Sequence, residues 1–460
     1  MKIEDLLTQN DHMKDICKRS GFFADSYAGG EAYRYGDYLE RHDHEHVDSF
    51  KRRKKVATFA NKCANVVDLY TNYLFREKIA RDLKLSGWAF DDYMKDADFC
   101  GNAHDVLMRE LSRQASIRGL VGIVVDKPKS DAVTMEQEKA NGIRPYISTY
   151  TPENIINFEF KRINGKPTLT TLVLREEDAE ESLSGEVELD IYRVWRRAGW
   201  QVYGVEDDKL ESAKLLDEGE HKMGEIPFVI VRNRGFNARF EGRSDIADIA
   251  DINRRIYRLD SDLDEIIENT AYPMLEAPHG GSDIIGGSSN IVEYDPENPT
   301  ARHAWLEPPH SSLAEIRNVR ADCVDDILAI AKTGAEGQDK TAKSGVSLEI
   351  EFQQLNAILA EKAENMEKVE NRIFYLFAKW QNFKGELGDV EYVRKFGIRD
   401  LSTDLDNAIK ARGAIQSRTF DKEQAVNLAS RVLADVDTET MLAIKTELDA
   451  PSTTDLINAV

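Results

Sequence analysis

The chain has 460 residues, 41% hydrophobic and 31% charged, which is long enough for about three domains and a sizeable core. Its 83 acidic residues outnumber its 61 basic residues and give a formal net charge of −22. That balance excludes a general nucleic-acid binder with a basic excess, and it excludes broad attraction to anionic lipid. The longest apolar runs, at 120–125 and 226–231, are far shorter than the ~20 residues of a membrane span, so no membrane partner is expected.

The beginning of the chain and the cysteines indicate a compartment. The first residues, MKIEDLLTQND, carry acids and no apolar segment, so no signal peptide is predicted. Four cysteines are scattered without a CxxC motif, at positions 17, 63, 100 and 323. This usage favours buried thiols in a reducing compartment over a disulfide framework, and a soluble cytoplasmic protein is expected.

Helical periodicity dominates the first 120 residues. Apolar side chains recur every three or four positions from Val56 to Leu74, and a second helix is predicted at about 102–118. The sequence GLVGIVVDKP that follows it predicts a buried strand ended by a proline. Between 145 and 233, six short β-type runs separated by polar turns predict an antiparallel β region.

The segment 245–272 contains no Gly or Pro and carries an apolar stripe from Ile246 to Ile266. It predicts a helix about 40 Å long with Ser244 as its N-cap and acids in its first turn. The next segment, 273–310, holds six of the twelve prolines and two Gly-Gly pairs. It is therefore expected to be a non-helical loop or a β module.

A second striped helix is predicted to begin at Ser312, which forms an S-x-x-E capping box with Glu315, and to end at Gly334. The polar, glycine-containing stretch 334–345 is interpreted as a mobile loop. Residues 347–383 again lack Gly and Pro and predict a helix of about 55 Å. A short strand at 390–396 and two or three small helices in the last 60 residues complete the expected elements.

Motifs that carry chemistry are absent from the sequence. Gly337 and Lys340 are three residues apart, so GAEGQDKTAK cannot form a P-loop. The chain has no G-x-G-x-x-G, H-E-x-x-H or G-x-S-x-G sequence. We therefore predict no catalytic residue, no cofactor and no metal site.

Two charged clusters nevertheless permit alternatives. His42, His44 and His46 alternate with acids and would ligate a metal if they lay on a strand, but a solvated polar linker is favoured because helical runs flank them. One interpretation of the basic sequence KRRKK at 51–55 is a patch that binds nucleic acid. A solvated helix face, or a strip of salt bridges between subunits, is the favoured interpretation.

Several strings resemble the bacteriophage portal protein family in the same order along the chain. They are YGDYLERHDHE followed by FANKCANVVDLYTNYLFREKI, then YTPENIINFEF, then IPFVIVRN with GRSDIADIADINRRIYRLDSDLDEIIENTAYPML, and finally KSGVSLEIEFQQLNAIL. The resemblance covers nearly the whole chain. It is the order of these strings along the chain, and not any single string, that resembles the family. It implies an α+β fold of portal-type architecture, with a helical stem, a β-containing wing and clip, a long spine helix and a small helical crown.

The resemblance also implies a division of the chain. It assigns 1–243 to the wing, 244–272 to a stem helix, 273–310 to the clip, 311–333 to a second stem helix, 334–346 to a tunnel loop, 347–400 to the spine helix and a wing strand, and 401–460 to the crown.

The function implied is not enzymatic. A ring, usually dodecameric, at one capsid vertex would pass double-stranded DNA during packaging and ejection. Its implied partners are further copies of itself, the terminase large subunit and a neck or tail adaptor at the clip, the major capsid protein and scaffold, and transiently DNA. The implied location is the virion, with the host cytoplasm during assembly.

A conduit for DNA must not hold it, because each phosphate neutralised by Lys or Arg adds affinity. The segment 245–272 has eight acids against three arginines, which suits a repelling wall. Expected channel-lining acids on the two stem helices are Asp260, Asp264, Glu268, Asp322 and Asp326. Expected transient DNA contacts in or beside the tunnel loop are Lys340, Lys343 and, more weakly, Lys332.

Two other functions remain open from the sequence. Clustered acids with a divalent metal would suit a phosphate-ester enzyme. Coiled-coil hairpins would suit an adaptor or scaffold without a channel, although they leave the β and proline-rich segments unexplained.

Overall fold

The computed structural model describes most of the chain. The described residues are 2–43, 45–131, 134–176, 189–206, 209–235, 240–271, 274–278, 292–294, 305–306, 310–332, 345–394, 396, 410, 417–432 and 438–449. The chain divides into two compact units, Met1–Phe396 and Gly397–Val460, and each is considered by itself.

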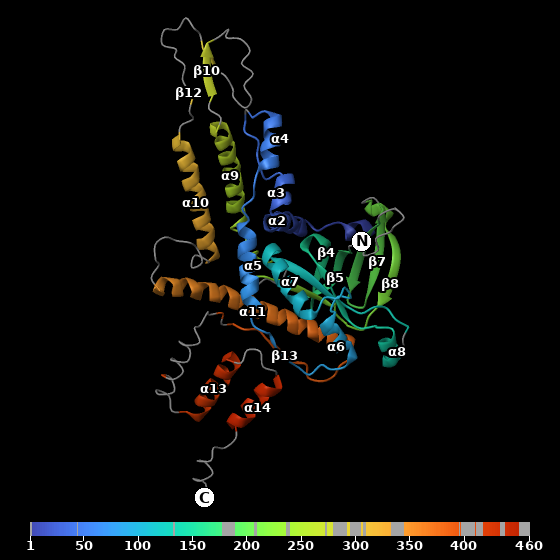
Figure 1. Cartoon of the computed structure of the whole chain (residues 1–460). Coiled ribbons are helices and arrows are strands. Elements are labelled where there is room, and N and C mark those ends of the chain that lie inside the picture. The colour runs from blue at the N-terminus through green and yellow to red at the C-terminus, as the bar shows by residue number, and fades with distance from the viewer. Residues whose placement is uncertain are drawn as a thin grey trace. The chain divides into compact units, whose positions relative to one another are not determined.

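Helices form most of the first 118 residues, as predicted (Figure 1). They are α1 Ile3–Leu7, α2 Asp11–Ala28, α3 Gly30–Tyr35, α4 Val47–Val56, α5 Lys62–Leu74, α6 Trp88–Lys95 and α7 His104–Arg118, with the short strand β1 Ala80–Leu83 between α5 and α6. The stripe from Val56 to Leu74 is not one helix, because the chain is non-helical from 57 to 61. Asn61 restarts the helix as the N-cap of α5, accepting a hydrogen bond from the Ala64 amide.

The predicted buried strand is confirmed as β2 Leu120–Asp126, in which every residue is buried. It is the centre of a three-stranded antiparallel sheet, between β3 Tyr146–Tyr150 and β9 Phe228–Arg232. A strand buried on both faces reads as a continuous apolar run, which explains the sequence LVGIVV. The short helix α8 Met135–Ala140 lies between β2 and β3 in the chain.

A five-stranded antiparallel sheet accounts for the rest of the predicted β region. Its strands run in the order β4 Ile155–Ile163, β5 Lys166–Glu176, β6 Leu189–Arg196, β7 Gly199–Glu206 and β8 Lys214–Glu220. The 3-10 turns Pro152–Asn154 and Leu210–Ser212 precede β4 and β8. The edge strand β8 was not predicted, because six of its seven residues are exposed and its sequence KLLDEGE lacks alternation.

Three long helices follow. They are α9 Ala250–Ala271, α10 His310–Ala331 and α11 Gly345–Trp380, confirming the three predicted helical segments with shifted ends. Residues 245–249 form turns rather than the first turn of α9, so Ser244 does not cap that helix. The helix α10 begins two residues before Ser312, which places Ser312 inside the first turn and not at the N-cap. The predicted terminator Gly334 lies outside the described residues.

Between α9 and α10 the described residues contain short strands, in agreement with the expected β module. The strand β10 Met274–Pro278 pairs in parallel with β11 Val292–Tyr294 and antiparallel with β12 Trp305–Leu306. After α11, β13 Gly388–Glu391 pairs antiparallel with β1 and is shorter than the predicted 390–396 strand. The second unit contains α13 Arg418–Val432 and α14 Thr438–Asp449, while most of the predicted helix 403–415 lies outside the described residues.

One hydrophobic core joins the helical elements of the first unit. It contains residues of α5, α7, β2, α9, α10 and α11, among them Val67, Leu111, Ile123, Ile256 and Leu359. The described residues thus form a mixed fold of helices and mainly antiparallel sheets, which is compatible with the expected α+β class. Within the described part of the chain, no helix has the length and apolarity that crossing a bilayer requires.

Candidate functional site

The helix α9 lies between two other helices. In Figure 1 it runs beside α10 on one side and α4 on the other, and it contacts both. Ile256 belongs to the same buried cluster as Cys323 and Ile327 of α10. Glu265, which approaches Arg53 of α4 to 3.7 Å, lies nine residues further on, or about two and a half turns at 3.6 residues per turn. The α10-facing and α4-facing sides of α9 are therefore opposite one another.

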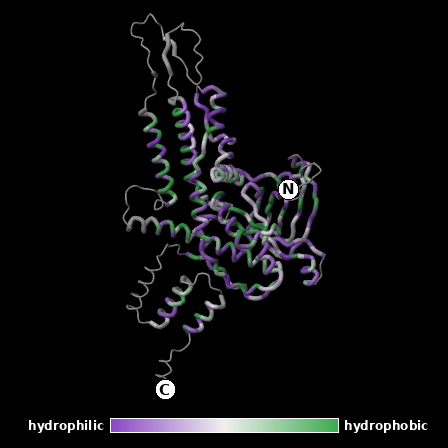
Figure 2. Tube along the Cα trace, viewed as in Figure 1, coloured by the Kyte–Doolittle hydropathy of each residue, from purple (hydrophilic) through white to green (hydrophobic). Residues whose placement is uncertain are grey.

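Arg53 fixes α4 to α9. Its buried guanidinium donates to both carboxylate oxygens of Glu45 at 2.9 and 2.7 Å and to Ser261 Oγ at 3.3 Å. Asp262 lies 3.5 Å away, and the neighbouring Arg52 pairs with Glu268. The hydrogen bond from Arg53 holds the pKa of Glu45 below its usual value. The helix α4 is mostly hydrophilic in Figure 2, and Arg52 and Arg53 of its basic sequence 51–55 bind acids of their own chain.

The base of α9 is fixed to α5 by Asn253. Its fully buried side chain accepts hydrogen bonds from the amides of Lys62 and Cys63, at 2.8 and 3.2 Å, and donates to the Ala60 carbonyl at 3.0 Å. These amides belong to the first turn of α5 and have no partner within that helix. A side chain of α9 therefore stabilises the start of a helix about 190 residues earlier in the sequence.

Most acids between 245 and 268, including two of the three predicted to line a channel, are bound within the chain. Asp260 accepts from Arg320 of α10, with one of the two bonds at 3.2 Å, and Glu268 pairs with Arg52. Ion pairs also hold Asp245, Asp248, Asp251, Asp262 and Glu265. Asp264 is exposed and forms no ion pair with any described residue. Of the three candidates on α9, Asp264 alone has its charge unneutralised by a described cation.

The helix α10 presents a different face. Asp322, Asp325 and Asp326 are exposed, and no cation of the described residues pairs with them. Cys323, Ile327 and Ala331, spaced by four, form the buried side that packs on the core. No Lys or Arg occurs between 321 and 331, so every charge on the outward side of this part of α10 is negative. Sequence reasoning selected Asp322 and Asp326 but missed Asp325, although its spacing from Asp322 already placed both on one helical face.

The predicted lysine contacts are only partly described. Lys340 and Lys343 lie outside the described residues. Lys332 follows α10 with a φ of 57°, a left-handed conformation uncommon for a residue with a side chain, and is half-buried. The left-handed conformation of Lys332 is not compatible with a continuing α-helix, so α10 ends before it.

The histidine cluster does not assemble a metal site among the described residues. Nε2 of His42 lies 3.3 Å from Asp262, and Nδ1 of His46 accepts from the Asp48 amide at the start of α4. His44 lies outside the described residues. In the part of the chain that the structure describes, no group of three His, Cys, Asp or Glu side chains has metal-binding geometry.

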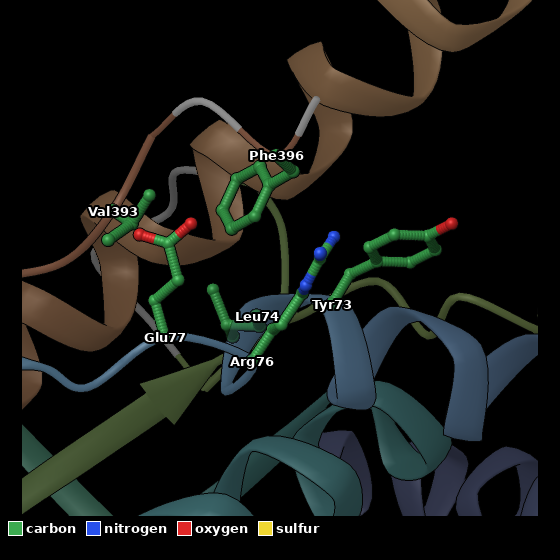
Figure 3. Close-up of a pocket in the computed structure, with 6 residues that line it drawn as sticks. All are labelled: Tyr73, Leu74, Arg76, Glu77, Val393 and Phe396. Atoms are coloured by element: carbon green, nitrogen blue, oxygen red, sulfur yellow. The ribbon is translucent and has the colours of Figure 1, made fainter. Parts of the chain in front are cut away.

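A small pocket lies where α5 ends, beside the segment after β13. It is lined by Tyr73, Leu74, Arg76, Glu77, Val393 and Phe396 (Figure 3). Its interior has room for about one water molecule. The candidate functional feature of the described residues is therefore a surface, the acidic face of α10, and not this pocket.

Comparisons with known proteins give little further guidance. No family model and no curated protein matches the sequence. One solved structure similar to this chain is described as the virion of a native gene transfer agent particle; the match covers 94% of this chain and 99% of that one, at 11% identity and a TM-score of 0.39. At that TM-score the likeness does not establish a shared fold.

Proposed function

We propose that the chain is a structural, non-catalytic portal protein whose copies form a ring around a channel for double-stranded DNA. The observation that carries the proposal is the antiparallel pair α9 and α10, joined by a β-containing segment, with an unpaired acidic face on α10 only. The order of elements after α10, with the 36-residue α11 and then a small helical unit, matches the order that the family resemblance requires.

Packing geometry favours α10 as the inner wall. Twelve helices side by side at about 10 Å form a ring of axes about 38 Å across, and subtracting one helix radius on each side leaves a bore of roughly 27 Å. That bore admits a DNA duplex roughly 20 Å wide. If α9 and α10 of every copy alternated in one wall, 24 helices would give a bore of roughly 65 Å, which would not guide a duplex. The layer α10–α9–α4 would then run outward from the channel.

The charges suit this orientation. Asp322, Asp325 and Asp326 on the inner face would repel phosphates and keep the duplex centred, since contact with fixed cations would instead release counterions and bind it. Asp264, on α9, would lie in the layer behind this wall, and Asp260 and Glu268 are neutralised by Arg320 and Arg52. Repulsion across the gap would weaken with salt, because the Debye length is about 8 Å at physiological ionic strength.

The remaining parts take the roles that the resemblance implies. Lys340 and Lys343, and less directly Lys332, would touch phosphates transiently from the loop after α10. The segment 273–310 would dock the terminase large subunit during packaging and a neck or tail adaptor afterwards. The outer surface would meet the major capsid protein and scaffold at one vertex of the virion, after assembly in the host cytoplasm.

Electron microscopy of the purified chain combined with a charge reversal tests the proposal. End-on views should show a ring with an open centre. Replacing Asp322, Asp325 and Asp326 by Lys should preserve that ring and tighten its binding of a short duplex at least tenfold at low salt, with the gain fading as salt rises. The matched control carries the same charge change at exposed acids of other elements, Glu136→Lys, Glu211→Lys and Glu220→Lys. A compact monomer, or equal tightening in the control, would reject the proposal.

A second experiment concerns the loop. Replacing Lys340 and Lys343 by Glu should leave the ring intact and alter the packaging or retention of DNA. Unchanged packaging and retention would remove the assignment of these two lysines without affecting that of α10.

A further inference from the structure

The ammonium group of Lys362, on α11, is completely buried and fully bonded. It donates to Asp245 Oδ2 and to Asn233 Oδ1, each at 2.5 Å, and to Ser116 Oγ. These acceptors come from the segment leading into α9, from the residue that follows β9 and from α7. Burial lowers the pKa of Lys362, and the Asp245 carboxylate opposes that shift. A buried lysine is retained only with such complete compensation.

The segment leading into α9 is tied to the same point by its backbone. The Asp245 amide and the Ser244 hydroxyl both donate to the Ser116 carbonyl, at 2.9 and 3.0 Å. Asp245 Oδ1 also lies 3.0 Å from Nε of Arg234, so its buried carboxylate is held by two cations. The chain therefore cannot shift at Asp245 without breaking charged hydrogen bonds in a buried site, which are among the stronger ones.

The last residue of α10 is attached to this cluster through Tyr70. The Tyr70 hydroxyl, on α5, donates to the carbonyl of Ala331, which ends α10. The Lys362 ammonium lies 5.7 Å from the centroid of the Tyr70 ring, within range of a cation–π contact. Tyr70, like Lys362, is almost entirely inaccessible to solvent. One buried cluster thus reaches the segment before α9 and the residue that closes α10.

We propose that Lys362, Asp245 and Tyr70 form a joint that clamps both base ends of the α9–α10 pair to α11, so that the pair moves as one body on this helix. The joint goes beyond the proposed channel, because it is a property of the single chain and requires neither ring nor DNA. Apolar contacts alone would permit sliding, since they are non-directional. Directional bonds from one ammonium fix the positions of the partners. These three side chains are positioning residues.

Hydrogen exchange on the full-length chain tests the joint. Tyr70→Phe removes one hydroxyl, and Lys362→Met replaces the ammonium by an apolar side chain of similar length. Each should accelerate amide exchange in α9 and the last turns of α10 by about tenfold relative to β5 and β6, which contribute no residue to the joint, because the pair opens locally before the core does. The matched control is Tyr93→Phe. Tyr93 is equally buried, and its hydroxyl bonds Nδ1 of His104 and no residue of the joint.

The double variant Tyr70→Phe/Lys362→Met distinguishes a joint from separate contacts. In a joint, the combined effect on exchange in α10 should be clearly smaller than the product of the two single effects, because either change already releases the helix end. Independent multiplication of the effects, uniform acceleration over the whole unit, or the same regional pattern in Tyr93→Phe would each overturn the proposal. If Lys362→Met fails to fold, Tyr70→Phe paired with Asp245→Asn provides the same cycle.

Discussion

The helices α9 and α10 each have 22 residues, with six acids on α9 and four on α10, and they use those acids differently. On α9, the carboxylates of Asp260, Asp262 and Glu268 each bind an arginine of another element. On α10, Asp322 and Asp326 extend from the surface without a described partner. The comparison shows that the number of acids on a helix does not predict how much negative charge the helix presents at its surface. What matters is which acids the fold leaves unneutralised.

The largest loss of stability is expected when the contact between α4 and α9 is removed at Arg53. Replacing it by Ala leaves the largely buried Glu45 without its partner and frees α4 from α9, so the free energy of unfolding should fall by about 3 kcal/mol. Urea denaturation measures the change. Lys55→Ala, at an exposed position on the same helix, should change stability by no more than about 0.5 kcal/mol. A similar loss in both variants would contradict the role of Arg53.

A buried carboxylate outside the helix pair, that of Asp126, should make the stability of the protein depend on pH. Burial raises the pKa of Asp126 to about 6, although Arg193 lies 3.1 Å away and opposes the shift. Between pH 4 and 6 the folded chain binds a proton that the unfolded chain has released, so this group lowers stability as pH rises through that window, by about 3 kcal/mol in total. Stability measured against pH should therefore fall less steeply across pH 4–6 in Asp126→Asn. Parallel curves for the two proteins would refute the prediction.

The docking of α9 at its base is tested at Asn253. The Ala variant leaves the buried amides of Lys62 and Cys63 without an acceptor and should cost about 2 kcal/mol. Thermal denaturation gives the value, and Asn72→Ala, at an exposed position of α5, is the matched control with little expected change. Equal effects at both sites would show that the buried cap is not what fixes α9.

The smallest expected effect comes from removing one acid from each helix, Asp260 from α9 and Asp322 from α10. Asp260→Asn should destabilise the chain by about 1 kcal/mol, because it weakens a partly buried pair with Arg320. Asp322→Asn should be neutral or slightly stabilising, since it relieves repulsion from the nearby Asp325 and Asp326. Denaturation in low salt resolves the difference. An equal loss in both variants would show that the acids of α10 also have partners.

Local periodicity was sufficient to predict most elements. The strand at Leu120–Asp126, the antiparallel region after it and the three long helices all followed from patterns of apolar residues. The edge strand β8 was missed because it buries almost nothing. The helix predicted across Val56–Leu74 was wrong at 57–61, because α5 begins only at Lys62, where Asn253, distant in sequence, accepts from the amides of Lys62 and Cys63.

The candidate site was less predictable than the fold. The sequence located the acids of both long helices, but it could not show that Arg52, Arg53 and Arg320 neutralise those of α9. It gave no sign of the cluster around Lys362, because a lysine on an amphipathic helix is ordinarily exposed.

The sequence by itself determined where apolar side chains repeat, and thereby the helices, the strands and the net charge of −22, because these depend on neighbours within a few positions. Only the tertiary structure decided which charges remain free and which are buried in pairs. Those outcomes depend on residues such as Lys362 and Asp245, 117 positions apart, meeting at bonding distance. Electrostatic interactions act through space and burial, and neither is set by position along the chain.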